Sequence, residues 1–180
     1  MTKNEIRILS ISKLQLFPGA IVYDIGAGSG SVAIECKRFV GPGQVYAIER
    51  KPEAIAVIRE NSERFGMPIQ IIEGEAPAAI EGLPEADRIF VGGTGGNLQS
   101  ILNRCDEQLA VGGRIVVNSV TMTTASDTCK FLEQMGYRLD VIQVNIANII
   151  KRGNSDMWQA RNPVTIITAE KMERPADKAE

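Results

Sequence analysis

The sequence predicts an α/β fold in which helices cover both faces of a mostly parallel sheet of seven strands. Two observations predict it. Short apolar runs typical of buried strands alternate with helical stretches almost from the start of the chain. A glycine-rich turn also follows the first apolar run and leads into a helix, as at the ligand-binding strand ends of open α/β sheets. The last strand is expected to run antiparallel.

Local signals place the elements of the first half. Thr2 followed by Glu5 has the spacing of a capping box ahead of apolar residues, which predicts a helix over residues 3–15. Pro52 stands where a first-turn proline belongs, so a helix begins there and ends near Gly66. The other elements of this half are strands at 20–25, 44–49 and 69–73 and a helix at 31–40.

The second half continues the alternation. Its elements are a short helix at 77–80, a strand at 88–91, a second glycine-rich loop at 92–96, a helix at 98–109, a strand at 114–120, a helix at 123–135, and strands at 139–149 and 164–168. Residues 171–180 are charged and poor in apolar side chains, which predicts a solvated tail after a single domain over residues 1–170.

Composition narrows the class of protein. A chain of 180 residues with 44% hydrophobic content suits one compact domain. The net charge of −2 and the scattered Lys and Arg residues give no footprint for nucleic acid or an anionic membrane, which favours a small-molecule substrate. No segment reaches the roughly 20 apolar residues that span a bilayer, and the start lacks the apolar run of a signal peptide. We therefore expect a cytoplasmic protein.

Cysteine and histidine usage excludes several chemistries. Cys36, Cys105 and Cys129 are far apart and odd in number, which fits neither a disulfide framework nor a zinc site, so no metal is expected. Histidine is absent, which removes the usual general base from consideration. Any reaction must depend on a cofactor or on carboxylates.

The glycine loop is the most informative motif. Gly26, Ala27, Gly28, Ser29 and Gly30 follow the first strand, where glycines let the backbone approach a ligand and a helix N-terminus supplies amide donors. A dinucleotide fingerprint needs its third glycine one residue later, at a position that holds serine. The spacing GxGxG after an aspartate is typical of S-adenosylmethionine-dependent methyltransferases. A tight turn without a ligand is the alternative.

Two further strand ends carry candidate cofactor contacts. Glu49 ends the second strand, 19 residues after Gly30, where a carboxylate can accept hydrogen bonds from both ribose hydroxyls. An ion pair with Arg50 or Lys51 is its alternative. Ala76 follows the third strand, where a small residue leaves room for an adenine ring, although an ordinary loop would look the same.

Candidate substrate contacts follow the later strands. Gly93 and Thr94 belong to a loop with four glycines at the end of the fourth strand, which a bulky planar substrate could approach. Asn118 ends the fifth strand on the same rim, or serves only as a turn-capping amide. Trp158 and Arg161 lie between the last two strands and are candidates for covering a substrate.

Several segments together resemble the decarboxylating cobalt-precorrin methyltransferase family of cobalamin biosynthesis, whose members methylate carbon 15 of the corrin precursor. The resemblance covers nearly the whole chain. It rests on the segments MTKNEIR at 1–7, DIGAGSG at 24–30, VYAIER at 45–50, EGEAP at 73–77, GGTGG at 92–96 and RNPV at 161–164. Only DIGAGSG is generic to class I, Rossmann-like methyltransferases.

The resemblance implies the reaction and its components. S-adenosylmethionine would be the methyl donor, held by Thr2, the loop 26–30, Glu49 and Ala76. The substrate would be cobalt-precorrin-6B, which loses carbon dioxide from an acetate side chain and gives cobalt-precorrin-7. A homotetramer and a separate methyltransferase for carbon 5 are also implied.

The residues suggest how such a reaction would proceed. The cofactor brings an electrophilic methyl group, and the protein's main task is to hold a ring carbon in line with it. We expect Gly93, Thr94 and Asn118 to line the corrin cleft and Arg161 to receive peripheral carboxylates. No residue stands out as a catalytic acid or base.

Three other functions remain open on the sequence alone. A methyltransferase of tRNA or of a protein carboxylate shares the cofactor loop, but the chain has no basic stripe for tRNA. A nicotinamide-dependent oxidoreductase would need the displaced glycine and a proton donor. A binding module without catalysis is the third, because fold alone does not prove function.

Overall fold

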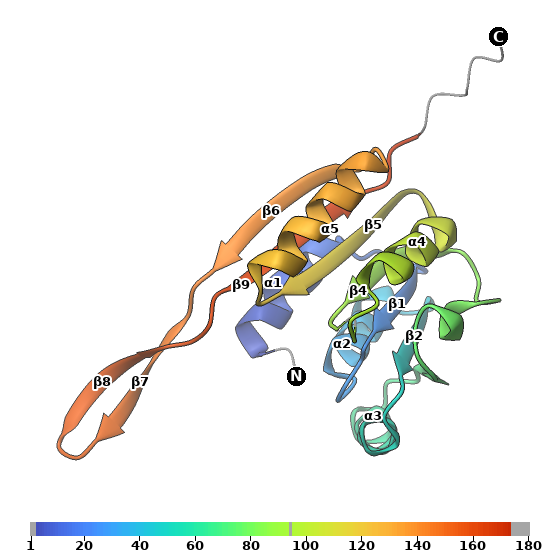
Figure 1. Ribbon diagram of the computed structural model, residues 1–180. Helices are drawn as coiled ribbons and strands as arrows, with labels where there is room; N and C mark the ends of the chain where they lie inside the picture. The colour runs from blue at the N-terminus through green and yellow to red at the C-terminus, as the bar shows by residue number, and fades with distance from the viewer. Residues whose placement is uncertain (1–2, 94, 174–180) are drawn as a thin grey trace, which may run out of the picture.

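The computed structural model describes residues 3–93 and 95–173. Helices lie on both faces of a seven-stranded sheet, and a separate two-stranded ribbon extends from it (Figure 1). The elements are α1 (Asn4–Leu14), β1 (Ile21–Ile25), α2 (Ser31–Val40), β2 (Gln44–Glu49), α3 (Pro52–Phe65), β3 (Gln70–Glu73), η1 (Ala78–Ile80), β4 (Ala86–Val91), α4 (Leu98–Gln108), β5 (Leu109–Ser119), α5 (Met122–Gln134), β6 (Arg138–Val144), β7 (Ala147–Arg152), β8 (Ser155–Ala160) and β9 (Val164–Glu170).

The strand order β3-β2-β1-β4-β5-β9-β6 confirms the predicted sheet. The first five strands are parallel, and β9 lies antiparallel between β5 and β6. The order reverses at β1, where Ile25 pairs with Ile48 of β2 on one side and Val91 of β4 on the other. Loops that leave β1 and β4 therefore diverge, which opens the crevice where such sheets bind ligands.

Two apolar layers hold the sheet between the helices. Tyr23 and Ile25 of β1 belong to the layer that includes Leu102 of α4 and Leu132 of α5. Val22, the residue before Tyr23, belongs to the opposite layer, which includes buried side chains of α1, α2 and α3. Alternate residues of β1 thus face opposite helix layers, which explains why the parallel strands are continuously apolar.

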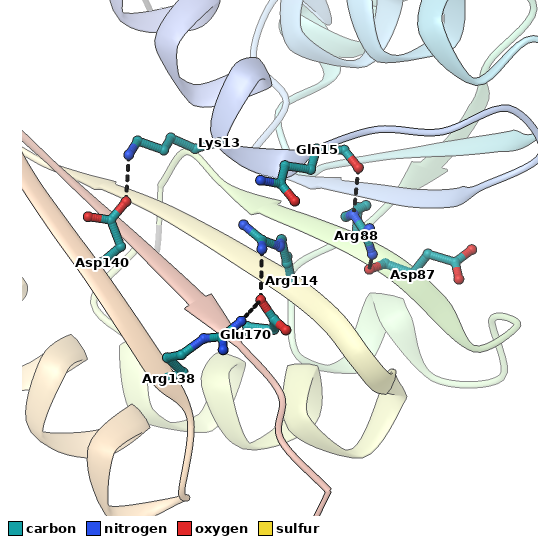
Figure 2. A network of polar contacts seen from close by, with 8 residues as sticks. All are labelled: Lys13, Gln15, Asp87, Arg88, Arg114, Arg138, Asp140 and Glu170. Carbon is teal, nitrogen blue, oxygen red and sulfur yellow. Dashed lines mark hydrogen bonds and ion pairs between the residues drawn. The ribbon is translucent and has the colours of Figure 1, made fainter.

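Charged side chains join the other end of the sheet to α1. Glu170 of β9 accepts hydrogen bonds from Arg114 of β5 and Arg138 of β6 (Figure 2). Lys13, in the last turn of α1, pairs with Asp140 of β6. Of these contacts, the Lys13–Asp140 pair joins α1 to β6, while the buried side chains of Ile6, Ile11 and Leu14 hold the helix against the sheet.

The region after α5 differs from the prediction. The strand expected at 139–149 is two strands, because the chain leaves the main sheet after Val144 and begins β7 at Ala147. β7 pairs with β8, which was not predicted, around a two-residue turn at Gly153 and Asn154. The resulting ribbon projects away from the body of the protein (Figure 1). The apolar pattern continues across residues 145–146, so periodicity alone does not mark the break.

The fold continues at least to Lys171. Its backbone N–H donates to Gly113 O, and its Nζ donates to the carbonyl oxygens of Asp106 and Leu109. Of the tail expected at 171–180, residues 174–180 lie outside the described residues. Among the described helices, none is long and apolar enough to cross a membrane.

Candidate active site

The glycine loop between β1 and α2 is held by contacts that require glycine. Gly26, Gly28 and Gly30 all have positive φ angles, of 73°, 58° and 72°. The N–H groups of Gly26 and Ala27 donate to Ile48 O at 3.0 and 3.1 Å. A Cβ atom on Gly26 would lie 3.0 Å from the carbonyl oxygen of Gly93, so the loops after β1 and β4 pack backbone to backbone.

Asp24 lies beneath this loop with 1% of its surface exposed. Its Oδ2 accepts a hydrogen bond from Ala33 N of α2 at 2.9 Å, while its Oδ1 is buried without a partner among the described residues. Burial raises the pKa of this carboxyl to about 7, and the nearby charge of Glu49 adds to the rise against the hydrogen bond from Ala33. Through the hydrogen bond from Ala33 N, Asp24 connects β1 to α2.

Glu49 ends β2 and holds the tip of the loop. Its Oε2 accepts from Gly28 N at 2.8 Å, and its Oε1 accepts from the backbone N–H groups of Arg50 and Lys51 at 2.9 and 3.0 Å. Burial acts to raise the pKa of Glu49, but the three N–H donors and the Lys51 charge lower it overall. The carboxylate is therefore ionised at neutral pH and fixed in place.

Two cavities meet at the glycine loop. The larger cavity, of about 690 Å³, lies along the start of α2, the ends of β4 and β5, and the chain after β8. The smaller cavity, of about 210 Å³, lies over the ends of β1, β2 and β3. Gly26 lines both. The arrangement suits an elongated ligand that crosses the loop and reaches into a wider space beyond it.

The structure brings most of the predicted site residues to these cavities. Ala27, Gly28, Ser29, Asn118 and Arg161 line the larger one, and Glu49, Ala76 and Gly93 line the smaller one. Gly30 caps α2 beside Ile58 and lines neither. Thr2 and Thr94 lie outside the described residues. Trp158 lies in β8 with 72% of its surface exposed and lines neither cavity.

Gly93 thus contacts a different space from the one expected. It was predicted to line the substrate cleft, but its position beside Gly26 places it on the smaller cavity, opposite Ala76 and Glu49. The cause is the packing of the two loops, which the separate glycine motifs did not reveal.

α1 forms a wall of the site, which the sequence analysis does not predict beyond the contact expected of Thr2. Lys3 and Ile6 line the larger cavity, and Ser10 is fully buried behind them. Ser10 Oγ donates to Ile6 O at 2.7 Å, which leaves it able to accept from Asn118 Nδ2 at 2.9 Å. The amide of Asn118 is therefore held by α1, 108 residues away in the chain.

Arg161 also reaches the larger cavity with a contact to α1. Its backbone N–H donates to Ile146 O at 2.8 Å, which fixes the chain as it leaves β8. Its Nη1 lies 3.6 Å from Oε2 of Glu5, with 32% of the Arg161 side chain and 47% of the Glu5 side chain exposed.

The sheet order, the glycine loop and the carboxylate at the end of β2 together define the fold class of the class I, S-adenosylmethionine-dependent methyltransferases. An O-methyltransferase of that class shares this fold with a TM-score of 0.79 at 19% identity. The family model described as "Precorrin methyltransferase domain" matches residues 1–171. The chain belongs to this precorrin methyltransferase family.

The names of similar proteins agree with this family assignment. A Sulfurisphaera tokodaii protein named "Probable cobalt-precorrin-6B C(15)-methyltransferase (decarboxylating)" is 44% identical over 95% of this chain and 90% of its own length. The "Cobalt-precorrin-6B C(15)-methyltransferase (decarboxylating)" of Salmonella typhimurium is 36% identical over 96% and 90%. The crystal structure of "Precorrin-6y C5,15-methyltransferase" from Geobacter metallireducens has a TM-score of 0.89 at 40% identity, with 95% and 91% of the chains covered.

Proposed function

We propose that the protein methylates carbon 15 of cobalt-precorrin-6B with S-adenosylmethionine and removes the acetate carboxyl group, giving cobalt-precorrin-7 in cobalamin biosynthesis. The observation that carries this proposal is the pair of cavities joined at the glycine loop, the smaller one sized for a nucleoside and the larger one wider than a methionine chain needs. The names of the relatives supply the substrate and the reaction.

The smaller cavity fits the adenosine half of the cofactor. Oε1 of Glu49 already accepts two N–H groups and Oε2 accepts one, so Oε2 keeps room for one ribose hydroxyl. Ala76 is 5% exposed on the same cavity and presents only a methyl group, which suits contact with an adenine face. These two residues would select adenosine by a hydrogen bond to the ribose and by the shape of the adenine pocket.

The loop 26–30 fits the methionine half. Its backbone lies at the N-terminal end of α2, where amide groups and the helix dipole favour a carboxylate. Added Cβ atoms at Gly26 or Gly30 would meet neighbouring atoms at 3.0 Å, so the close backbone path depends on both glycines. Thr2 is part of this proposed set through the family resemblance.

When bound, S-adenosylmethionine supplies an electrophilic methyl group, and the residues of the larger cavity position the carbon that receives it. Asn118 presents an amide whose orientation Ser10 fixes. Arg161 offers charged N–H donors to peripheral carboxylates of the substrate. Gly92 lines the larger cavity on the β4 side, and Thr94 stays in the proposed substrate set, whereas Gly93 lies on the smaller cavity. The conjugated macrocycle itself can accept the electrons released by loss of carbon dioxide.

The test is anaerobic incubation of the purified protein with S-adenosylmethionine and cobalt-precorrin-6B, followed by mass spectrometry. We expect a product that has gained one methyl group and lost one carboxyl group as carbon dioxide. An unchanged tetrapyrrole, with cofactor binding intact by calorimetry, would refute the corrin substrate and favour a methyltransferase of tRNA or a protein carboxylate.

We further propose a cytoplasmic homotetramer that acts beside a separate carbon-5 methyltransferase, with the single domain predicted over residues 1–170 extended to include Lys171. Support for assembly comes from the β7–β8 ribbon, on which Ile149 and Trp158 pair across the strands with 59% and 72% of their surfaces exposed. Exposed paired apolar residues favour contact with a second copy of the chain. Light scattering should give four copies for the wild type and fewer for Trp158→Glu; a wild-type monomer would refute the assembly.

A further inference from the structure

The charged residues around the larger cavity are unevenly placed. Among its described lining residues, Asp24 lies buried beneath the glycine loop, whereas Lys3 lies just before α1 and Arg161 just after β8. The cationic lining side chains are therefore Lys3 and Arg161, and neither belongs to the glycine loop. An anionic group of a ligand in this cavity can pair with them.

The Arg161 guanidinium is only weakly held. Its Nη1 lies 3.6 Å from Glu5 Oε2, which is too long for a hydrogen bond, and both side chains are partly exposed. Within residues 3–93 and 95–173, Glu5 is the carboxylate that approaches Arg161, and the guanidinium forms no hydrogen bond to a side chain there. An exposed pair of this kind contributes little and can be exchanged for a better partner.

We propose that Lys3 and Arg161 form a carboxylate-binding subsite for the substrate, and that Glu5 occupies Arg161 until a substrate carboxylate replaces it. The proposal rests on the proposed function for the identity of that substrate, a macrocycle with peripheral carboxylates. A substrate carboxylate can take two parallel N–H donors from the guanidinium, which Glu5 does not achieve at 3.6 Å. Glu5 is thereby an internal competitor that sets substrate affinity.

This exchange predicts that substitutions at the two ends of the Glu5–Arg161 pair change the substrate KM in opposite directions. Glu5→Gln removes the competitor and a charge that repels the substrate, so substrate KM should fall by up to about fivefold with kcat unchanged. Arg161→Ala removes charged donors, so KM should rise by about tenfold to a hundredfold. In the Arg161→Ala background, Glu5→Gln should recover much less than fivefold.

A matched control exists elsewhere on the surface. Glu81 pairs with Arg104 at 2.9 Å and lines neither cavity. Glu81→Gln makes the same chemical change and also breaks a carboxylate–arginine pair, so it should leave KM unchanged. A fall in KM for both variants would mean that general surface charge, not the subsite, controls binding, and would overturn the proposal.

A binding measurement separates this proposal from the proposed function. Uroporphyrin, a porphyrin with carboxylates around its rim, is titrated into the full chain containing S-adenosylhomocysteine, and bound ligand is measured by calorimetry. We expect tighter binding for Glu5→Gln and weaker binding for Arg161→Ala, with cofactor affinity unchanged. Equal or weaker binding for Glu5→Gln would overturn the subsite. Failure of the wild type to convert cobalt-precorrin-6B, with this binding pattern intact, would refute the proposed function alone.

Discussion

Asp24→Asn should make the protein more stable above neutral pH and change the pH dependence of that stability. The carboxyl is 1% exposed, its Oδ1 has no described partner, and burial raises its pKa from 3.8 to about 7. Between these values the folded state holds a proton that the unfolded state has released. The contribution of Asp24 to stability is therefore fully present below about pH 4 and lost as pH rises through about 7.

The magnitude follows from the size of this shift. About three pKa units at 1.36 kcal/mol each give a loss of up to about 4 kcal/mol by pH 8. Asparagine is neutral at every pH, and its amide oxygen can still accept from Ala33 N. The difference in unfolding free energy between Asp24→Asn and wild type should therefore be near zero at pH 4 and grow to as much as about 4 kcal/mol above pH 7.

Urea unfolding at several pH values between 4 and 8.5 measures this difference. Asp127→Asn on the exposed side of α5 is the control, because surface substitutions usually change stability by no more than about 0.5 kcal/mol. A difference between Asp24→Asn and wild type that stays constant across this pH range would refute the argument, because it would mean that the buried carboxyl does not change protonation on folding.

Three further changes test the site. Glu49→Gln replaces an acceptor of three backbone N–H groups, so it should weaken S-adenosylmethionine binding at least about tenfold by calorimetry. Ser10→Ala leaves the amide of Asn118 without its partner, so it should cost about 1–3 kcal/mol in urea and lower kcat. Gly26→Ala combines a positive φ with a contact at 3.0 Å, so it should destabilise more than Gly19→Ala, whose added methyl group meets nothing within 4 Å. Equal losses for the two glycine variants would contradict the packing argument.

The parallel core was predictable because the local sequence pattern of each helix and strand agrees there with its place in the tertiary structure. The helix at Ser31–Val40 and the strand at Gln44–Glu49 match the predicted ranges residue for residue. β5 begins five residues earlier than predicted, at Leu109, because Gly112 and Gly113 look like a turn in sequence. The strand is irregular there: its pairing with β4 jumps from Leu109 opposite Ala86 to Arg114 opposite Arg88, Gly112 has a φ of 77°, and Gly112 N donates to Lys171 O.

The β7–β8 ribbon and the α1 wall were not predictable from local pattern. An alternating strand carries no mark of which sheet it joins, so the sequence predicts one strand over residues 139–149. The contact between Ser10 and Asn118 depends on how α1 packs against β5, which no short motif encodes. The glycine loop was predictable because its geometry is local. Each of its glycines has a positive φ angle, which the sequence indicates residue by residue.

The bond from Gly28 N to Glu49 joins two recognition elements into one rigid part. The carboxylate that faces the nucleoside cavity also holds the backbone that would meet the amino-acid end of the cofactor. Little conformational entropy then remains to be lost when a ligand arrives, because the loop is already ordered. Both ends of the cofactor then meet one preformed surface, so a nucleoside fragment and an amino-acid fragment should bind nearly independently, with little coupling free energy between them.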